Sequence, residues 1–318
     1  MKLKQIIGSI LICYSIASYA DVYASSNESY PLDTVIWQNL NIPVCWENIS
    51  ADAFLRGEVQ NAVQSTWEDN SQLDFTGWGQ CPTGFFNGIR IGVEDTGAHV
   101  KALGNDLINI RNGMVLNFTM QKWNELCPDV YGVTNCVRWI AVHEFGHALG
   151  FAHEQNRPDT PDYCTENAQG TSGNAIFTEW DRDSIMNYCN PNYNGFGNLS
   201  AIDILTVQTY YGRIPTYSLA RTLQIPVVQV GAARYSASLS DIDGDGKFRL
   251  YALFSTANQS SRTPTYQLST SVLNLPLVKV IDGSNHVVSL YSAIMQRHSD
   301  GKFSILSISL LQPVPTTN

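Results

Sequence analysis

The residues best suited to chemistry in this sequence are three histidines and a glutamate that lie between Trp139 and Glu154. His143 and His147 are four residues apart, so on a helix their side chains lie on one face, one turn apart. Two imidazole nitrogens placed in this way can bind one tetrahedral metal ion. Glu144 is offset around the helix, where a carboxylate can act on a water molecule as a general base without binding the ion itself.

A third donor follows the helix. Gly150 can adopt the left-handed conformation that ends a helix and turns the chain, and His153 then returns toward the first two histidines. Three protein ligands leave a fourth position free, which is typical of catalytic rather than structural zinc. The full pattern has roughly a one in 100,000 chance of arising anywhere in a chain of this composition. The alternative, three ordinary buried histidines, is therefore disfavoured.

This stretch resembles the extended zinc signature of the metzincin metalloendopeptidases, which reads here His143-Glu144-x-x-His147-x-x-Gly150-x-x-His153. Glu154, directly after the third histidine, makes it most similar to the astacin branch. The resemblance also covers a methionine turn, Ser184-Ile185-Met186-Asn187-Tyr188, in which Met186 is expected to form the apolar floor beneath the histidines. Tyr188 matches the astacin tyrosine that binds zinc through its phenol and then stabilises the oxyanion, two tasks to which a phenol is suited.

The resemblance extends over residues 30 to 213 and implies a secreted zinc-dependent endopeptidase that cleaves peptide bonds in proteins or peptides. One catalytic Zn²⁺ would be held by His143, His147, His153 and Tyr188, with Glu144 as general base acting on a zinc-activated water. Residues 96 to 107 are expected to contain the edge strand that pairs with an extended substrate, centred at Val100 to Leu103.

The sequence also departs from the astacin pattern. Astacins usually carry a prodomain aspartate on the zinc, and a new N-terminus that pairs with the equivalent of Glu154. About ten residues separate the expected leader from Trp37, too few for such a prodomain. We therefore expect Glu154 to pair with a neighbouring side chain or with the backbone. The arrangement of six cysteines also differs from the astacin pattern.

Residues 1 to 24 are typical of an export signal, with Lys2 and Lys4 before an apolar run and small residues at its end. Removing this segment and Cys13 leaves six cysteines, an even number that suggests three disulfides in an exported protein. Six cysteines allow 15 pairings. We expect near neighbours to pair: Cys45–Cys81, Cys127–Cys136 and Cys164–Cys189.

Composition excludes several classes of protein. Of the 318 residues, 44% are hydrophobic and only 15% are charged, which excludes a disordered polyelectrolyte. A net charge of −9 and only 19 basic residues argue against binding to nucleic acid or to an anionic membrane surface. After the N-terminal segment, no apolar stretch is long enough to span a bilayer.

Composition changes along the chain, because every tryptophan and all six of these cysteines lie between Trp37 and Cys189. A helix stop at Gly212 followed by Pro215 places a boundary near residues 213 to 220. The first part, residues 30 to 213, is expected to be α+β, with a small twisted mixed sheet and helices packed on it. Its expected strands are 35–37, 42–46, 89–93 and 114–118, and its expected helices are 51–70, 137–149 and 200–211.

The second part, residues 220 to 318, is expected to form an all-β, sandwich-like accessory domain. Its expected strands are 222–230, 247–255, 265–272, 277–281, 286–293 and 302–311. Asp245-Gly246-Lys247-Phe248 recurs as Asp300-Gly301-Lys302-Phe303. An internal duplication is one explanation, and two independent Asp-Gly hairpin turns are the favoured one.

Asp241, Asp243 and Asp245 stand at alternate positions, as in a calcium loop, but Ala252 occupies the place of the closing acid of an EF-hand. A hydrated Asp-rich turn is therefore favoured over a Ca²⁺ site.

Two other functions stay open. In one, the protein is an adhesin or binds a carbohydrate or a protein through its C-terminal domain, on a vestigial protease scaffold. In the other, the zinc is purely structural, which requires a fourth protein ligand that only Tyr188 could supply.

Overall fold

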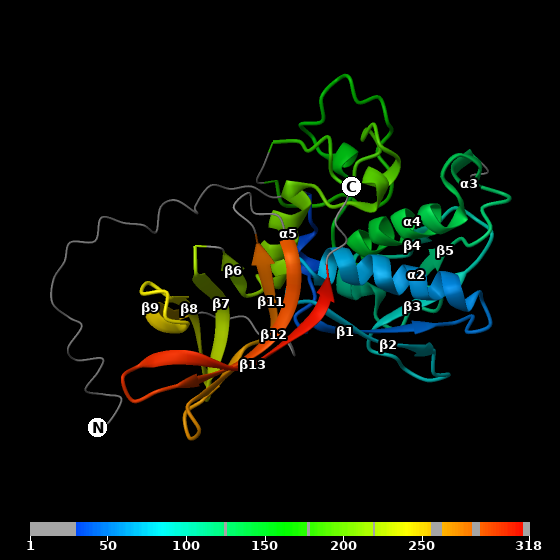
Figure 1. Ribbon diagram of the computed structural model, residues 1–318. Coiled ribbons are helices and arrows are strands. Elements are labelled where there is room, and N and C mark those ends of the chain that lie inside the picture. The colour runs from blue at the N-terminus through cyan, green and yellow to red at the C-terminus, as the bar shows by residue number, and fades with distance from the viewer. Residues whose placement is uncertain are drawn as a thin grey trace.

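The computed structural model describes residues 30–123, 126–176, 179–218, 220–255, 263–281 and 287–313. The expected export signal lies outside these residues. The buried apolar residues form two main clusters, one drawn from Ile36 to Tyr211 and the other from Leu223 to Phe303. The first cluster comes from a part of the chain that combines a sheet with helices, and the second comes from a part made of strands (Figure 1). No helix in the described part of the chain is long and apolar enough to cross a membrane.

The first part contains a mixed sheet of five strands in the order β2-β1-β3-β5-β4. β1 lies parallel to β2 and β3, β3 lies parallel to β5, and β4 is antiparallel to β5 at the edge. The bounds are Asn41–Trp46 for β1, Asp74–Gln80 for β2, Ile89–Val93 for β3, His99–Val100 for β4 and Met114–Leu116 for β5. The expected α+β class with a small mixed sheet is thus what the structure shows.

Helices α2 and α4 lie together over this sheet (Figure 1). In α2 (Ala53–Val63), Asp52 caps the first turn, and the buried residues recur with a helical period. The helix continues as a π-helical turn, η3 (Gln64–Glu68), within the expected range. The zinc-motif helix α4 runs from Val133 to Ala148, so it begins four residues before the expected start. α5 (Ala201–Tyr211) begins, as expected, at a capping box formed by Ser200.

Some local expectations were wrong. The strand expected at Val35–Trp37 is replaced by a 3₁₀ turn, η2 (Asp33–Val35), and by a loop in which Trp37 Nε1 donates to Ala148 O at 2.7 Å. Strand β2 and helix α3 (Leu126–Tyr131) were not expected. The remaining short 3₁₀ segments are η4 (Gly104–Leu107), η5 (Glu154–Asn156) and η6 (Tyr193–Gly197).

The three disulfides join the expected near neighbours: Cys45–Cys81, Cys127–Cys136 and Cys164–Cys189.

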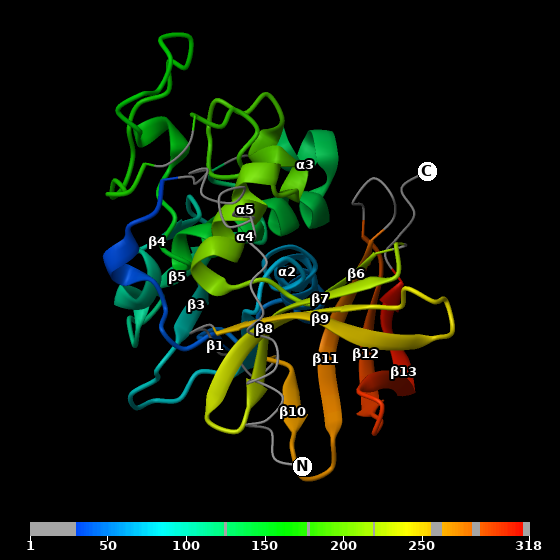
Figure 2. The same cartoon turned by 90° about the vertical axis from the view of Figure 1, so that its left-hand side faces the viewer.

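The second part is a single eight-stranded sheet that closes on itself, and the expected two-layer sandwich is not confirmed. Its order is β10-β11-β12-β13-β9-β8-β7-β6, and β10 also pairs with β7 while β11 pairs with β6 (Figure 2). The bounds are Thr216–Ser218 for β6, Thr222–Val230 for β7, Ala233–Ser240 for β8, Lys247–Ser255 for β9, Thr265–Gln267 for β10, Val272–Ile281 for β11, Val287–Arg297 for β12 and Lys302–Pro313 for β13. β6 and β8 were not expected. The expected strand 265–272 is shortened to β10, and β11 begins at Val272, five residues before the expected strand 277–281.

The strands of this part form two equivalent halves, β6–β9 and β10–β13. Both Asp-Gly-Lys-Phe segments lie at hairpins, β8–β9 and β12–β13, as expected, but their equivalent places in the two halves favour a duplication over an independent origin. Tyr217 packs edge-on against Phe248 at 6.0 Å, and Tyr266 packs against Phe303 at the same distance. The registers of β7 and β11 shift at equivalent points, one at Pro226 and the other at Pro276.

The halves are related by a pseudo-two-fold axis. Gln229 N donates to Pro264 O at 2.8 Å, and its counterpart Lys279 N donates to Pro215 O at 2.8 Å. β9 and β13 meet in antiparallel register with Phe248 opposite Phe303, as strands related by a two-fold axis must. This matching geometry favours an internal duplication.

The two parts are joined by contacts from the second half of the closed sheet. Lys279 is buried and donates through Nζ to Asn70 Oδ1 at 2.8 Å, just after η3. Burial lowers the pKa of Lys279. Thr263 Oγ1 donates to Gln72 Oε1 at 3.4 Å. Asn70 and Gln72 therefore connect the closed sheet to the segment that follows α2.

Candidate metal centre

The three histidines of the motif converge on one point. His143 Nε2 lies 3.2 Å from His153 Nε2, and His147 Nε2 lies 3.0 Å from the same atom. Their ligand atoms all lie within 4.8 Å of one another, and the three side chains are buried. Among the described residues, this is the group of His, Cys, Asp and Glu side chains that could hold a metal ion.

The other nitrogen of each ring fixes its tautomer. His143 Nδ1 lies 2.7 Å from Ile185 O, His147 Nδ1 lies 2.7 Å from Phe151 O, and His153 Nδ1 lies 3.0 Å from Gln169 O. A carbonyl oxygen can only accept, so each Nδ1 carries the proton and each Nε2 presents a lone pair.

The chemistry of this donor set fits a cation. Burial lowers the pKa of His143 to about 3 and also lowers the pKa values of His147 and His153, so all three rings are neutral near pH 7. Three lone pairs that face one another at these distances repel unless a positive charge lies between them. A zinc ion would supply that charge and accept all three nitrogens.

The local sequence places these rings on α4 and the turn that follows it. Gly150 has φ +95°, a backbone conformation that is unfavourable for residues with a Cβ atom. The resulting turn lets Phe151 N donate to Gly146 O at 3.0 Å. The chain then reverses so that Phe151 O accepts from His147, and His153 faces the helix.

A second turn supports the histidines from below. Met186 is fully buried, and its neighbour Ile185 provides the carbonyl that holds His143. Helix α5 holds this turn in place, because its Asp203 accepts hydrogen bonds from Ser184 Oγ at 2.7 Å and from Ile185 N at 2.9 Å. Burial raises the pKa of Asp203 to about 6.

Sequence reasoning did not assign Asp203 to the site. Its visible signal was local, since Asp203 also completes the capping box with Ser200 at the start of α5.

Glu144 and Tyr188, the two expected catalytic side chains, lie at the same centre. Glu144 is buried on α4, and its Oε2 has no hydrogen-bond partner among the described residues. Burial raises the pKa of Glu144 to about 8. The Tyr188 ring lies 4.5 Å from the His153 ring and 5.6 Å from the His143 ring, measured between centroids. Burial, and then the charge of Glu144, raise the pKa of Tyr188.

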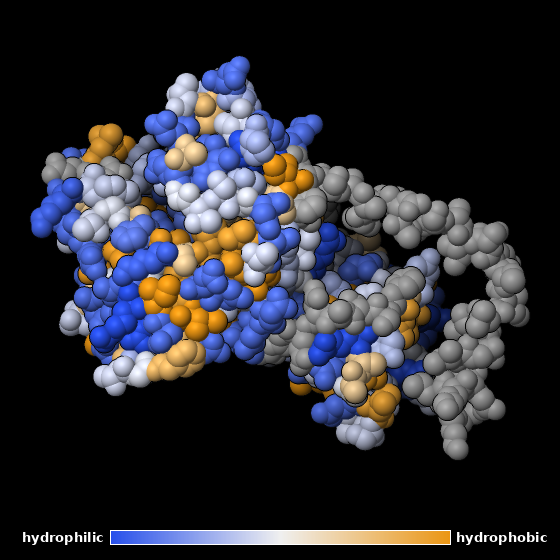
Figure 3. Space-filling model, turned by 180° about the vertical axis from the view of Figure 1, so that it is seen from behind, coloured by the Kyte–Doolittle hydropathy of each residue, from blue (hydrophilic) through white to orange (hydrophobic). Residues whose placement is uncertain are grey.

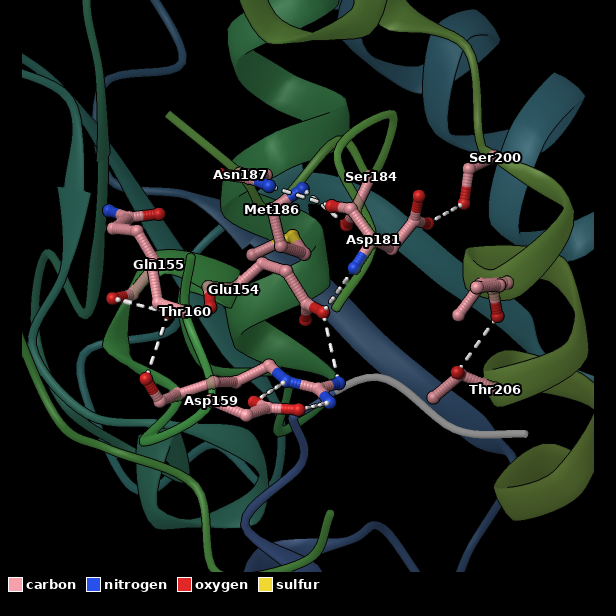
Figure 4. Close-up of polar contacts among 12 residues, drawn as sticks. Glu154, Gln155, Asp159, Thr160, Asp181, Ser184, Met186, Asn187, Ser200 and Thr206 are labelled. Carbon is pink, nitrogen blue, oxygen red and sulfur yellow. Dashed lines mark hydrogen bonds and ion pairs between the residues drawn. The ribbon is translucent and has the colours of Figure 1, made fainter. Parts of the chain in front are cut away.

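Glu154 pairs with its neighbours, as expected. Its Oε1 accepts from Arg157 Nη1 at 3.0 Å and from Asp181 N at 2.9 Å, and both Glu154 and Arg157 are buried. Asp181 in turn accepts from Asn187 Nδ2 through its carbonyl at 2.6 Å and from Ser200 Oγ through its side chain at 2.6 Å. Figure 4 shows Glu154 and Asp181 lying beside the turn that carries Met186. Glu154 therefore links the segment after His153 to the methionine turn.

The Asp-rich turn lies far away along the chain, and its carboxylates have protein partners. Asp241 accepts from the backbone N–H groups of Asp245 and Gly246. Lys302 Nζ lies 3.3 Å from Asp243 Oδ2 and 2.8 Å from Asp245 Oδ2. The segment forms the turn between β8 and β9.

The comparisons with known proteins agree with the geometry around the histidines. Residues 128–211 match the model of the Astacin peptidase family. The chain is 41% identical over 86 residues to meprin A subunit beta of Rattus norvegicus, and 34% identical over 90 residues to the zinc metalloproteinase dpy-31 of Caenorhabditis elegans. The resemblance to the astacins is confirmed.

The region that matches is a small part of this chain and of the two relatives. The matches cover 27% and 24% of this chain, and only 10% and 14% of the lengths of meprin A subunit beta and dpy-31. Among solved structures, that of myroilysin is similar with a TM-score of 0.41 and 20% identity, covering 58% of this chain and 98% of that chain.

Proposed function

We propose that this protein is a secreted zinc-dependent endopeptidase. The observation that carries the proposal is the convergence of three neutral Nε2 atoms whose Nδ1 partners are all backbone carbonyls. Residues 30 to 213 would form the catalytic domain and residues 220 to 318 an accessory domain. Residues 1 to 24 would direct export and be removed.

In this proposal His143, His147 and His153 hold the zinc ion, and Tyr188 is a fourth, displaceable ligand. Bound zinc would polarise the carbonyl of the scissile peptide and lower the pKa of a water molecule. The three carbonyl contacts orient the imidazoles and keep their protons on Nδ1.

Glu144 would act as the proton carrier. Its buried carboxyl has one oxygen without a hydrogen-bond partner in the described structure, so this oxygen is free to accept a proton from the attacking water. Glu144 would then donate that proton to the leaving amine. Tyr188 lies beside two of the histidine rings, and its phenol would donate to the oxyanion that forms on the substrate.

The substrate would be an extended peptide paired with β4. This strand is the antiparallel edge of the sheet, and it falls at His99–Val100, within the expected range of 96 to 107. An edge strand offers unpaired backbone groups to a peptide in extended conformation.

Replacing Glu144 by Gln tests the proposal. We expect Glu144→Gln to retain zinc, because no ligand is changed, and to lose peptide cleavage by a factor of about 100 to 10,000. Tyr188→Phe should retain zinc as well and lose about 100- to 1,000-fold. Glu58→Gln, on α2, is the control: it weakens only a partly exposed ion pair with Arg138 at 3.0 Å, and it should cleave like the wild type. A peptide library with and without chelator provides the assay, and full activity of Glu144→Gln would refute the assigned base.

The vestigial-scaffold alternative is not favoured, since every expected residue is present and the histidines converge. The comparisons give no support to binding of a protein or glycan by the C-terminal part, because the family match ends at residue 211.

A further inference from the structure

The last strand of the closed sheet has a long free edge. β13 (Lys302–Pro313) pairs with β12 over its length, from Arg297 opposite Phe303 to Ser289 opposite Pro313. On its other side it pairs with β9 only from Lys302 to Ser304. From Ile305 onward, β12 is therefore the strand that pairs with β13 in the described structure. Figures 1 and 2 show β11, β12 and β13 side by side, with β13 outermost.

This free edge is apolar and uncharged. The exposed fractions are 44% for Ile305, 59% for Leu306, 56% for Ile308, 53% for Leu310 and 49% for Leu311. No charged residue follows Lys302 in the sequence. Exposed edge strands usually carry charges, which oppose pairing with another chain. The free part of β13 has none, although apolar residues also reach the surface of the helix-containing part, as Figure 3 shows from behind.

The order of residues along the edge is symmetric. Reading outward from Ile308, Ser307 matches Ser309, Leu306 matches Leu310, and Ile305 matches Leu311. An antiparallel pair of two such strands centred on Ile308 would place serine opposite serine and every apolar side chain opposite another. The ladder between β12 and β13 has no register shift from Ser307 to Leu310, the stretch that contains Ile308.

We propose that β13 pairs in antiparallel register with β13 of a second copy of this chain, with Ile308 on the two-fold axis. The contact would continue a mode of association already present in the fold, because β9 and β13 pair antiparallel about Phe248 and Phe303. A contact between identical strands about a two-fold axis closes on itself and gives a dimer rather than a fibre. This inference does not depend on the proposed peptidase activity.

One strand from each chain makes a small interface, below the standard size of about 1,600 Å². The dimer should therefore be concentration-dependent. Each chain carries a net charge of −9, so two copies repel one another. Added salt screens this repulsion, and it should strengthen the dimer.

Sedimentation equilibrium of the full protein tests the proposal. Ile308→Lys places two ammonium groups face to face on the axis and should raise the dimer dissociation constant by at least about tenfold. The matched control is Leu253→Lys. Leu253 lies five residues after Phe248, as Ile308 lies five after Phe303, and it is 48% exposed. This control should dimerise like the wild type.

Opposite charges at position 308 in two variants distinguish the loss of the dimer contact from the loss of the folded structure. Ile308→Glu alone should also be monomeric, but mixing it with Ile308→Lys should restore a dimer that contains one copy of each, because opposite charges then meet on the axis. Equal far-ultraviolet circular dichroism and equal unfolding curves would show that each variant folds.

Three results would overturn the proposal: a wild type that stays monomeric at about 100 µM, a dimer that Ile308→Lys leaves intact, or a dimer that Leu253→Lys dissociates. Failure of the mixed variants to associate would count against pairing at Ile308.

Discussion

Replacing Gly146 by Ala tests how tightly the methionine turn packs against the zinc-motif helix. Gly146 lies on α4 between His143 and His147. A Cβ atom added there would come well inside 3.0 Å of Met186 Sδ and within 3.2 Å of Trp67. Met186 and Trp67 are both fully buried, so either side chain can move only by displacing its neighbours in the core.

Two effects of opposite sign set the magnitude. Overpacking of a rigid core costs about 1–3 kcal/mol, and the burial of both neighbours places this site at about 3 kcal/mol. Alanine is favoured over glycine inside a helix by about 1 kcal/mol. We therefore expect Gly146→Ala to lower the free energy of unfolding by about 2 kcal/mol.

Gly57 on α2 provides the matched control, because an added Cβ atom would meet nothing within 4 Å. Gly57→Ala should raise the free energy of unfolding by up to about 1 kcal/mol. The two substitutions are chemically identical and should change stability in opposite directions.

Urea unfolding in the presence of a chelator, followed by tryptophan fluorescence, measures both effects. All seven tryptophans lie between Trp37 and Trp180, so the signal reports the helix-containing part. Zinc content should also fall in Gly146→Ala, since a displaced methionine turn moves the Ile185 carbonyl that holds His143. A Gly146→Ala variant as stable as Gly57→Ala would refute the packing argument.

Two further predictions concern protons and the support of the turn. Burial raises the pKa of Glu144 to about 8, so this carboxyl is mostly protonated at pH 7 in the metal-free protein. A dication nearby favours the ionised form, and zinc binding should therefore release close to one proton; the apparent affinity should rise about tenfold per pH unit below pH 8. Calorimetry in buffers of different ionisation enthalpy measures this release, which Glu144→Gln should lower by about one proton, and an unchanged release in that variant would contradict the assignment. Asp203→Asn should lower the free energy of unfolding by about 1–3 kcal/mol, because an amide cannot accept all three hydrogen bonds from Ser184, Ile185 and Ser200. Zinc affinity should fall by about 10- to 100-fold through the loss of support for His143, as equilibrium dialysis would show, and an unaltered affinity would argue that Ile185 needs no such support.

The closed sheet shows where sequence reasoning was incomplete. The repeated Asp-Gly-Lys-Phe segments were visible, but they were attributed to independent turns. A longer match was also present, since Leu223-Gln224-Ile225-Pro226 corresponds to Leu273-Asn274-Leu275-Pro276. Shared turn residues alone indicate only a local turn. The symmetry shows in contacts between distant strands, in which Gln229 of the first half pairs with Thr265 of the second, and Lys279 of the second half pairs with Thr216 of the first.

The strands that were missed have different causes. β2 contains two glycines and shows no apolar run that predicts a strand. β8 does carry a strand signal that was overlooked, since its apolar residues Ala233, Tyr235, Ala237 and Leu239 alternate with polar ones. Their neighbours in the sheet supply the hydrogen bonds that make them strands. At Val35–Trp37 the apolar run that predicts a strand is present, but these residues lie in a turn and a loop and are buried there without pairing in a sheet.

By itself, the sequence predicted the ligand set and the base, because a helix and a turn convert the short spacings of His143, Glu144, His147 and His153 directly into geometry. It left 15 pairings open for the six cysteines, and the near-neighbour pairing that was preferred is the one in the structure. Only the tertiary structure decided which atoms hold those ligands in place. The carbonyls of Ile185 and Gln169 and the carboxylate of Asp203 come from segments distant in sequence, and no local pattern specifies that they meet the histidines. Tautomer, charge and orientation of the imidazoles follow from those contacts, since a buried ring takes its protonation from the partner it faces.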